Sequence, residues 1–216
     1  MSEALPIYFN DLYSLSRLPW FDLERGRLVV SDKSVGPIID MHSHLALAYA
    51  RPISVDLQAL HPETEYYLPA CAGFDLERYI NKNFTPKQLK TLSRDLALKS
   101  VTSGGMRRTH TRPNLERDMR DMGIAHSVIL PIDLFSFMSR NAYNALDATR
   151  GHDTMVCFGS VHPYDRHRER LIDEQAALGA RGVKVHPNVQ SVLPASKGCM
   201  ALYRQCAKLG LPVLIH

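Results

Sequence analysis

The sequence predicts a single α/β domain whose core is a sheet of parallel strands. Segments with helical periodicity alternate four times with short apolar runs of the kind that form buried parallel strands. A glycine follows each of these helical segments and precedes the next apolar run, as expected where a helix ends and a strand begins. Hydrophobic residues make up 45% and charged residues 22% of the 216 residues, which is typical of a folded globular domain.

The charge and the start of the chain argue against several classes of partner. The formal charge of +4 is small for this length, and the basic residues are scattered, so we expect no nucleic-acid partner. We interpret the one basic cluster, Arg107, Arg108, His110 and Arg112, as part of a solvated loop. The start of the chain does not resemble a secretory signal, and no apolar run reaches the ~18 residues of a membrane helix. We therefore expect a cytoplasmic protein with no membrane partner.

The cysteines favour a reducing compartment. They do not have the spacing of a zinc ribbon, and two of them fall in apolar patterns, where a reduced thiol behaves as a small hydrophobic group. The four residues are Cys71, Cys157, Cys199 and Cys206.

The chain is predicted to begin with an irregular lead-in, residues 1–35, in which only the stretch "RLVVSD" resembles a strand. Gly36 and Pro37 then interrupt the chain, and the apolar run that follows, residues 38–42, predicts the first core strand. The main domain is therefore expected to span residues 36–216.

A long segment without strand signals, residues 45–112, follows the first core strand and is predicted to be a lid-like insertion. Thr85 is the expected N-cap of a helix in this segment, with Pro86 at its first position. Leucines then recur at helical spacing until the glycine pair that begins at Gly104. Segments of this length usually form lids or binding elements, so we expect the insertion to cover the mouth of the site.

Four helix–strand units follow Pro113 in the same order of signals. Asp165 and Ser196 are the expected N-caps of the third and fourth helices. The predicted helices are residues 113–122, 138–149, 165–178 and 196–209. The predicted strands are "AHSVILPID" (125–133), "TMVCFGSVHP" (154–163), "GVKVHP" (182–187) and "LPVLIH" (211–216).

Alternating strands and helices predict parallel strands joined by right-handed crossovers, which occur in (β/α)8 TIM barrels and in doubly wound open sheets. Periodicity alone does not separate these two folds. No glycine-rich phosphate-binding motif follows any strand, which disfavours the nucleotide-binding version of the open sheet. Both folds stay open on these signals, and the sequence contains about five strands of either.

Two histidines one residue apart end the first predicted strand, in "PIIDMHSHL". Because side chains alternate along a strand, Asp40, His42 and His44 are expected to share one face. Both imidazoles would then lie at the carboxyl end of the strand, where the active sites of barrels are found. Such a pair next to a carboxylate is typical of zinc sites, whereas a structural pair would cap the strand or bind a loop.

The last predicted strand, "LPVLIH", also ends in a histidine, His216. The carboxyl ends of parallel strands meet at one edge of a sheet, so His42, His44 and His216 are candidate ligands of one divalent ion. Three imidazoles suit zinc and similar divalent ions. Asp40 is a candidate for orienting one of the rings from behind.

The strand "GVKVHP" places Lys184 and His186 on one face and its valines on the other. A buried lysine needs an anion, a carboxylate partner or a chemical modification. Lys184 is therefore a candidate for binding an anionic substrate or, as a carbamate, for bridging two metal ions, and the alternative is a structural hydrogen bond. His186 either contacts substrate or closes a turn, and His162 after the preceding strand is a weaker analogue.

Four segments in this order and spacing, "DMHSHL", "FGSVHPYD", "GARGVKVHPNVQ" and "LGLPVLIH", resemble the amidohydrolase superfamily. The resemblance covers about residues 36–216 and is specific to the amidohydrolase-2 group related to aminocarboxymuconate semialdehyde decarboxylase. It implies a distorted (β/α)8 barrel and a single divalent ion, most often zinc. By position, His42 and His44 match the family's ligands on the first strand, and His216 matches the ligand that ends the fifth.

The chain departs from this family after His216. Family members continue for three more strands, which supply a catalytic histidine and a metal-binding aspartate. Five strands cannot close an eight-stranded barrel, and a terminus on a core strand would leave its edge exposed. We therefore expect residues 1–216 to be part of a longer protein of roughly 300 to 350 residues, and to be inactive alone.

These observations lead to three functional hypotheses. The first is a metal-dependent hydrolase that uses activated water on a lactone, ester or amide. The second, also represented among the relatives, is a non-oxidative decarboxylase of an aromatic or unsaturated acid, whose carboxylate Lys184 or an arginine of 107–112 would hold. The third is a non-catalytic half-barrel that binds or assembles. A small-molecule substrate is expected, and a homodimer is compatible with all three.

Overall fold

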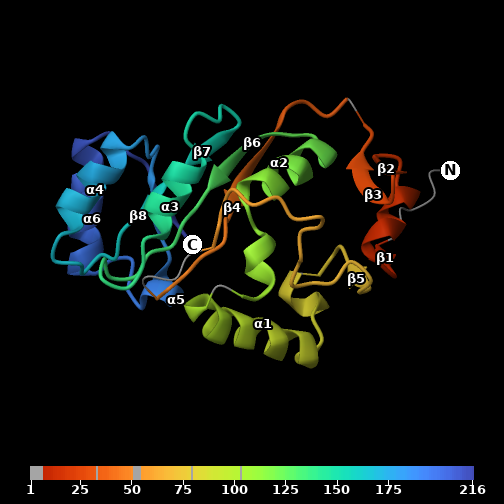
Figure 1. Cartoon of the computed structure of the whole chain (residues 1–216), viewed down its shortest axis with the longest axis horizontal. Helices are drawn as coiled ribbons and strands as arrows, with labels where there is room; N and C mark the ends of the chain where they lie inside the picture. Colours follow the sequence, from red (N-terminus) through yellow and green to blue (C-terminus); the bar gives the residue numbers. More distant parts are fainter. Residues whose placement is uncertain (1–6, 33, 51–54, 79, 103) are drawn as a thin grey trace.

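The computed structural model describes residues 7–32, 34–50, 55–78, 80–102 and 104–216. Its core is an array of parallel strands that lie next to one another in chain order (Figure 1). The mixed α/β class predicted from the sequence is confirmed. The strands of the array are β4 (Ile38–Ser43), β6 (Ile124–Ile129), β7 (Met155–Cys157), β8 (Gly159–Ser160), β9 (Val183–Val185) and β10 (Val213–Ile215).

The third predicted strand is divided in two at Phe158. β7 pairs with β6, while β8 pairs with β9, so the array consists of two three-stranded sheets. Phe158 joins them, because its N–H donates to the carbonyl of Ile129 (2.9 Å) and the next N–H, that of Gly159, donates to Gly182 (2.8 Å). Within the described residues these small sheets do not close into a barrel. The barrel itself therefore stays a prediction.

Each of the four predicted helices is present, within a few residues of its expected ends. Ser196 caps the last of them as predicted, because its hydroxyl accepts the N–H of Cys199. The predicted cap Asp165 is wrong, because its carboxylate accepts the N–H groups of Ser136 and His167 and the helix starts later. The helices are α2 (Arg112–Asp121), α3 (Asn141–Ala148), α4 (Arg168–Ala177) and α6 (Lys197–Lys208), with the short α5 (Pro187–Gln190) not predicted.

The two sides of the strand array are packed differently. Val183 and Val185 of β9 pack with Ile172 of α4 and Leu202 of α6, so helices cover that side. Lys184 lies between these valines and therefore faces the other side. We call this other side the inner side, and its apolar cluster consists of Val128, Leu130, Val156, Phe158 and Leu214.

The inserted segment contains the predicted helix, α1 (Pro86–Leu98). Thr85 and Gln88 form a capping box at its start, which satisfies two backbone N–H groups that a helix end leaves free. The helix ends at Leu98, earlier than the glycine signal at Gly104 suggested, and passes into a 3-10 turn. The other elements of the insertion are β5 (Phe74–Asp75), η2 (Ile80–Asn83), η3 (Lys99–Val101) and η4 (Met106–Thr109).

Arg107 is buried, with 3% of its surface exposed, so its interpretation as part of a solvated loop is wrong. Its guanidinium donates hydrogen bonds to the carbonyl groups of Leu47, Lys99 and Thr102. A guanidinium carries five N–H groups in fixed directions, so it can hold several carbonyls at once. Arg107 thereby ties the start of the insertion to its end. The interpretation holds for Arg108, whose side chain is 58% exposed.

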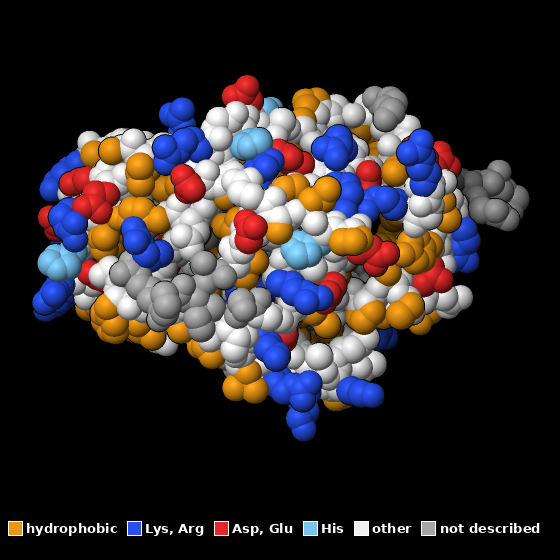
Figure 2. Space-filling view, in the orientation of Figure 1, with side chains coloured by type: hydrophobic (Ala, Val, Ile, Leu, Met, Phe, Trp, Pro, Cys, Tyr) orange, Lys and Arg blue, Asp and Glu red, His pale blue; other side chains and the backbone are white. Residues whose placement is uncertain are grey.

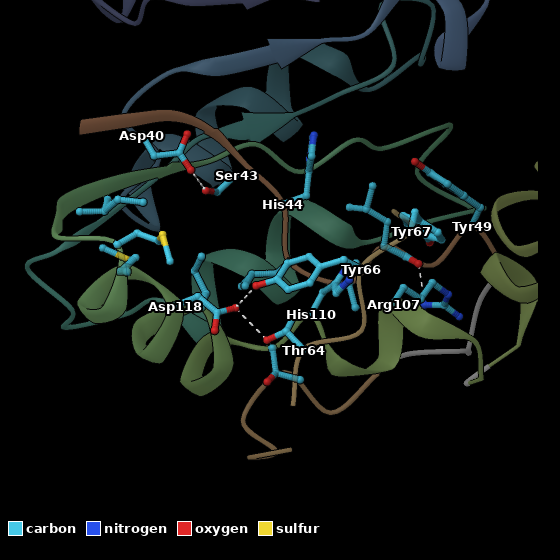
Figure 3. A pocket seen from close by; sticks show the side chains of 18 residues that line it. Asp40, Ser43, His44, Tyr49, Thr64, Tyr66, Tyr67, Arg107, His110 and Asp118 are labelled. Carbon is cyan, nitrogen blue, oxygen red and sulfur yellow. Dashed lines mark hydrogen bonds between the residues drawn. The ribbon is translucent and has the colours of Figure 1, made fainter. Parts of the chain in front are cut away.

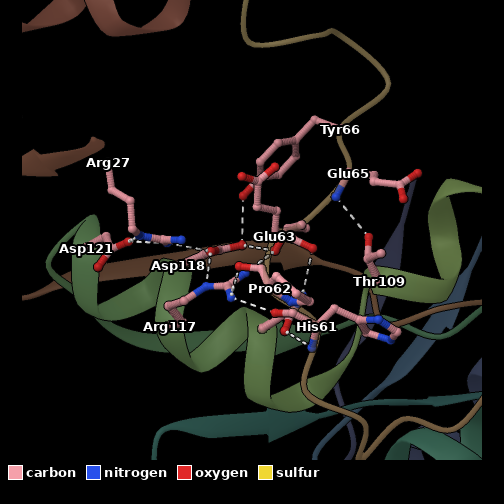
Figure 4. Close-up of polar contacts among 12 residues, drawn as sticks. Arg27, His61, Pro62, Glu63, Glu65, Tyr66, Thr109, Arg117, Asp118 and Asp121 are labelled. Carbon is pink, nitrogen blue, oxygen red and sulfur yellow. Dashed lines mark hydrogen bonds and ion pairs between the residues drawn. The ribbon is translucent and has the colours of Figure 1, made fainter. Parts of the chain in front are cut away.

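The lead-in is more ordered than predicted. A hairpin turns at Arg25 and Gly26, which both have positive φ, as the common two-residue hairpin turn requires. Arg27, directly after the turn, pairs with Asp118 and Asp121 of α2 and so attaches the hairpin to the domain (Figure 4). The elements of the lead-in are β1 (Tyr8–Phe9), η1 (Leu12–Arg17), β2 (Phe21–Glu24) and β3 (Arg27–Val30), of which only β3 was predicted.

The surface carries both signs of charge. On the face shown in Figure 2, acidic and basic side chains are interspersed, and basic ones gather over α1. No helix among the described residues is long and apolar enough to cross a membrane. The cysteines are free thiols, as predicted, and all but Cys71 are buried.

Candidate functional site

Four imidazoles gather where the strands β4, β9 and β10 end. The ring centroid of His42 lies 5.0 Å from that of His44 and 5.1 Å from that of His216. His186, which follows β9, stacks on His216 with a centroid distance of 4.1 Å and an interplanar angle of 16°. We call these four residues the imidazole cluster. The structure thus brings together histidines from the first and last strands of the array, which are far apart in the sequence.

His44 is oriented by a backbone carbonyl. Its Nδ1 atom lies 2.6 Å from the carbonyl oxygen of Leu130, at the end of the neighbouring strand. A carbonyl can only accept, so Nδ1 carries the proton and Nε2 presents its lone pair. Burial lowers the pKa of His44 to about 4, which keeps the ring neutral at pH 7. This is the arrangement found in metal-bound histidines, where a second group fixes the tautomer.

His42 presents its Nε2 atom to the same point. The Nε2 atoms of His42 and His44 are 3.1 Å apart, and His44 provides the lone pair, so His42 donates the proton of this contact. No hydrogen bond of the His42 Nδ1 atom among the described residues fixes this tautomer, so the proton can move to Nδ1 and leave Nε2 free for an ion. Two nitrogens bound to one tetrahedral zinc ion at 2.0–2.1 Å are separated by roughly 3.3 Å. The pair therefore already has nearly the spacing of two ligands of one ion.

Asp40 contacts Ser43, a residue that alternation predicted on the other face of the strand. Its carboxylate accepts the backbone N–H of His42 (2.9 Å) and the hydroxyl of Ser43, which in turn lies 3.1 Å from the hydroxyl of Ser127. The register of β4 against β6 is irregular between Asp40 and Ser43, so strict alternation fails there. Asp40 thus shapes the backbone that carries His42, and its role in orienting a ring stays a prediction.

His186 has the opposite tautomer to His44. Its Nδ1 atom accepts the N–H of Val189 at 3.3 Å, so that the imidazole caps α5. Because an accepting Nδ1 leaves the proton on Nε2 in a neutral ring, His186 presents an N–H donor rather than a lone pair. Burial lowers its pKa to about 4, and the proximity of His216 and Lys184 acts in the same direction. His186 is therefore suited to donating a hydrogen bond and unsuited to binding a metal through Nε2.

These tautomers can be observed directly. In the metal-free chain at pH 7, long-range ¹H–¹⁵N correlation spectra are expected to show His44 protonated at Nδ1 and His186 protonated at Nε2. His162 provides a control, because its Nδ1 accepts the N–H of Tyr164 and its Nε2 must donate to the carbonyl of Gln190. A proton on Nε2 of His44 would contradict the assignment of this ring as a ligand.

Lys184 is the buried cation of the site. None of its surface is exposed, and no hydrogen-bond partner for its Nζ atom is found in the part of the chain that the structure describes. Burial lowers its pKa to about 8. The charge of Lys184 also lowers the pKa of every histidine in the imidazole cluster, which places it close to all four. An amine without a partner at this point is suited to an anionic group, as its sequence position indicated.

The replacement Lys184→Met is expected to stabilise the metal-free chain by about 1–3 kcal/mol at pH 7, because methionine fills similar space without burying a charge. The unfolded chain binds the lysine proton more tightly than the folded chain, so the stability of the original chain should rise between pH 8 and about pH 10.5. The advantage of the variant should shrink over the same interval. Urea unfolding at pH 7 and pH 9.5 with a chelator present measures both effects.

Lys87, an exposed lysine of α1, provides the matched control. Lys87→Met should change the free energy of unfolding by less than about 0.5 kcal/mol at either pH. A Lys184→Met variant that is less stable than the original chain would mean that the amine has a partner.

His162 lies outside the imidazole cluster and holds loops together. Its ring stacks on Phe135 with a centroid distance of 3.9 Å, and its two nitrogens bond to the backbone of Tyr164 and Gln190. The three loops that follow β6, β8 and β9 therefore meet at this ring. The sequence indicated His162 as a weaker candidate for the site than His186, and the structural role of His162 agrees with that.

The donor set suits zinc, but it is incomplete as it stands. Among the described residues, no three His, Cys, Asp or Glu side chains are arranged to hold one ion together. His42 and His44 form a two-ligand pair, and His216 is the nearest further imidazole, with its ring 5.1 Å from that of His42. A third ligand thus requires a change in the His216 side chain or a group from another part of the protein.

Sequence reasoning missed the groups that set the tautomers. The carbonyl of Leu130 and the N–H of Val189 are backbone atoms, and no residue pattern distinguishes them from others. The one usable signal was position, because Leu130 directly follows β6, the strand next to β4. Val189 is three residues after His186, which is the spacing of an N-cap contact.

Comparisons with known proteins show similarity to solved structures but identify no family. No family model matches the chain, and no curated protein matches it. The chain is similar to the crystal structure of a probable 2-pyrone-4,6-dicarboxylic acid hydrolase from Acinetobacter baumannii with citric acid bound. The TM-score is 0.37 and the identity 14%, over 83% of this chain and 49% of the other, so this chain spans about half the length of that protein.

Proposed function

We propose that this chain is the histidine-bearing part of a metal-dependent hydrolase that acts on the carbonyl group of a small molecule. The observation that carries the proposal is the pair of Nε2 atoms of His42 and His44, 3.1 Å apart, with the lone pair of His44 fixed by Leu130. His216 is proposed as the third ligand, and zinc as the ion. When bound, such an ion acts as a Lewis acid and makes water a nucleophile at neutral pH.

The other two residues of the site would act on the substrate. His186 presents an N–H donor, and a donor aimed at a carbonyl oxygen stabilises the charge that develops there during attack. Lys184 is a buried cation close to the imidazole cluster, and its Nζ atom has no hydrogen-bond partner among the described residues. It would attract a carboxylate on the substrate or offset the negative charge that develops during the reaction. We therefore propose a substrate that carries both a carbonyl group and an anionic group.

The strand order supports a barrel over an open sheet. The described strands follow one another in chain order, whereas a doubly wound sheet reverses its order at the point where it binds ligand. We propose that the array is part of the wall of a (β/α)8 barrel, with the imidazole cluster at its carboxyl end.

A decarboxylase is the second candidate, and Lys184 is the observation that favours it. A buried amine beside a ligand pair would hold the carboxylate that leaves as carbon dioxide. The arginine alternative is disfavoured for Arg107, whose N–H groups bind backbone carbonyls of the insertion. A non-catalytic module remains the third candidate, because the described ligand set holds only a pair.

Zinc titration of the purified chain, read by competition with a coloured chelator, tests the metal proposal. One ion bound per chain with a Kd of about 10 µM or tighter would support it, while no binding by a folded chain would overturn it. The full-length protein, loaded with zinc, is then assayed on carboxylated lactones and esters and on aromatic acids. Product acid without carbon dioxide supports hydrolysis, and release of carbon dioxide supports the decarboxylase.

A further inference from the structure

A second site lies on the opposite side of β4 from the imidazole cluster. It is a cavity of about 520 Å³ between β4, α2 and the inserted segment (Figure 3). His44 borders it, but both ring nitrogens of His44 contact groups outside the lining, namely His42 and the Leu130 carbonyl. Neither Lys184 nor the other histidines of the cluster line it. The cavity therefore borders the proposed metal site at His44 and Asp40 but does not include the ring nitrogens that would hold an ion, and it has the size of a small-molecule pocket.

One end of the cavity is apolar. Leu115, Met119 and Met122 lie at intervals of four and three residues, so α2 turns one face of side chains toward β4. Ile124 follows on β6, and Leu45 of the insertion packs with Met119 in the same hydrophobic cluster. Side chains of this kind gain free energy when an apolar ligand displaces water from between them.

The other end holds a buried positive charge. Arg107 is 3% exposed, and the groups that receive its hydrogen bonds are neutral carbonyls. No carboxylate among the described residues forms an ion pair with it, and Asp95 acts on it only at longer range. Burial lowers the pKa of Arg107, because removal from water disfavours the charged form. In Figure 3, Arg107 lies with Tyr49 and Tyr67 at the end of the cavity away from Asp40.

Thr111 adds an unused hydrogen-bond group to the same lining. It is fully buried, and its hydroxyl has no partner among the described residues, although it occupies the N-cap position of α2. A buried hydroxyl without a partner is uncommon because it has lost its hydrogen bonds to water. Arg107 and Thr111 flank the same stretch of the insertion, because Arg107 donates to the carbonyl of Leu47 and the carbonyl of His110, just before Thr111, accepts the N–H of Ala46. A ligand with an acceptor atom near Thr111 would supply the missing partner.

The acidic groups of the lining are already engaged. Asp118 accepts hydrogen bonds from Thr64 and Tyr66 and pairs with Arg27, and Asp40 accepts from Ser43 (Figures 3 and 4). They do not compensate Arg107, because it has no ion pair among the described residues. An anionic group of a ligand would therefore lie at the Arg107 end and away from both aspartates.

We propose that this cavity binds an apolar monocarboxylate, with the hydrocarbon body against α2 and the carboxylate at the end formed by Arg107 and Thr111. The proposal does not depend on the metal site. It follows from three features together: an apolar cavity of small-molecule size, a buried cation without a counter-ion, and a buried hydroxyl without a partner.

The probes are decanoate, below its micelle concentration, and decan-1-ol, which has the same chain without the charge. Binding to the chain is measured by calorimetry with a chelator present, so that metal does not contribute. Decanoate is expected to bind with a Kd of about 100 µM or tighter, at least tenfold more tightly than decan-1-ol. Equal affinity for the two probes would overturn the anion site, and no binding of decanoate to folded protein would overturn the proposal altogether.

Thr111 provides a matched pair of variants. Thr111→Val removes the unpartnered hydroxyl at constant shape, so it should raise the melting temperature of the free chain and weaken decanoate about fivefold. Thr111→Ser keeps the hydroxyl and should bind within about twofold of the original chain. A Thr111→Val chain that binds decanoate as tightly as the Thr111→Ser chain would show that the hydroxyl is not part of the site.

Methyl NMR locates the ligand. Decanoate should shift the methyl signals of Met119 and Met122, which line the cavity, and leave that of Met200 on α6 unchanged. Shifts at the ring of His216 with unchanged Met119 and Met122 signals would place the probe at the imidazole cluster instead and overturn the proposed location.

Discussion

His44→Ala is expected to weaken zinc binding by about 100-fold, the largest effect of any single change in the imidazole cluster. His44 is the one ring whose lone pair is fixed by a neighbouring group, the Leu130 carbonyl at 2.6 Å. Removing it deletes a ligand and leaves His42 without the nitrogen that it faces at 3.1 Å. Competition of the variant and the original chain for zinc against a coloured chelator at pH 7 measures the difference.

Two further variants test the assignment of roles. His186→Ala should change zinc affinity less than about threefold, because His186 presents a proton rather than a lone pair. His126→Ala is the matched surface control, since His126 is exposed at the other end of β6. If His186→Ala weakened zinc binding as much as His44→Ala, the tautomer of His186 would be misassigned and four imidazoles would have to be considered as ligands.

The convergence of the histidines could be predicted from sequence, but their chemistry could not. His42 and His216 end the first and last predicted strands, and parallel strands bring their carboxyl ends to one edge. Which nitrogen carries the proton depends on the backbone atoms of Leu130 and Val189, and every residue has such atoms. The contact between Asp40 and Ser43 was not predicted, because a register irregularity in β4 interrupts the alternation on which the prediction relied.

The fold was likewise predicted well where a sequence pattern is long and poorly where it is short. α1 and α6 were predicted with their caps, Thr85 and Ser196, because a capped helix of 12 or 13 residues repeats its pattern several times. Strands of two to four residues, such as β1, β2 and β5, contain too few residues to show a period. The split of the third strand at Phe158 was also missed, because it depends on which neighbour each N–H bonds to.

Arg107→Met is expected to lower the free energy of unfolding by about 3–5 kcal/mol, the largest effect on stability of any single change in the insertion. The guanidinium is buried and donates to the carbonyls of Leu47, Lys99 and Thr102. Methionine fills part of the space but leaves these carbonyls without donors, and each unpaired buried group costs roughly 1–3 kcal/mol. Urea unfolding measures the total loss of unfolding free energy. We expect this loss to be smaller than the sum of the costs of the three carbonyls, because the insertion can relax.

Two control variants separate the effect of the hydrogen bonds of the Arg107 guanidinium from the effect of its charge. Arg107→Lys keeps the charge but cannot reach three carbonyls in fixed directions, so it should lose more than half as much stability as Arg107→Met. Arg108→Met, at the exposed neighbour, should change stability by less than about 0.5 kcal/mol. Hydrogen exchange should quicken in both Arg107 variants around residues 45–48 and 99–110, since Arg107 joins these segments. Unchanged exchange there would mean that other contacts hold the insertion. The start of the insertion, directly after His44, would then not depend on Arg107.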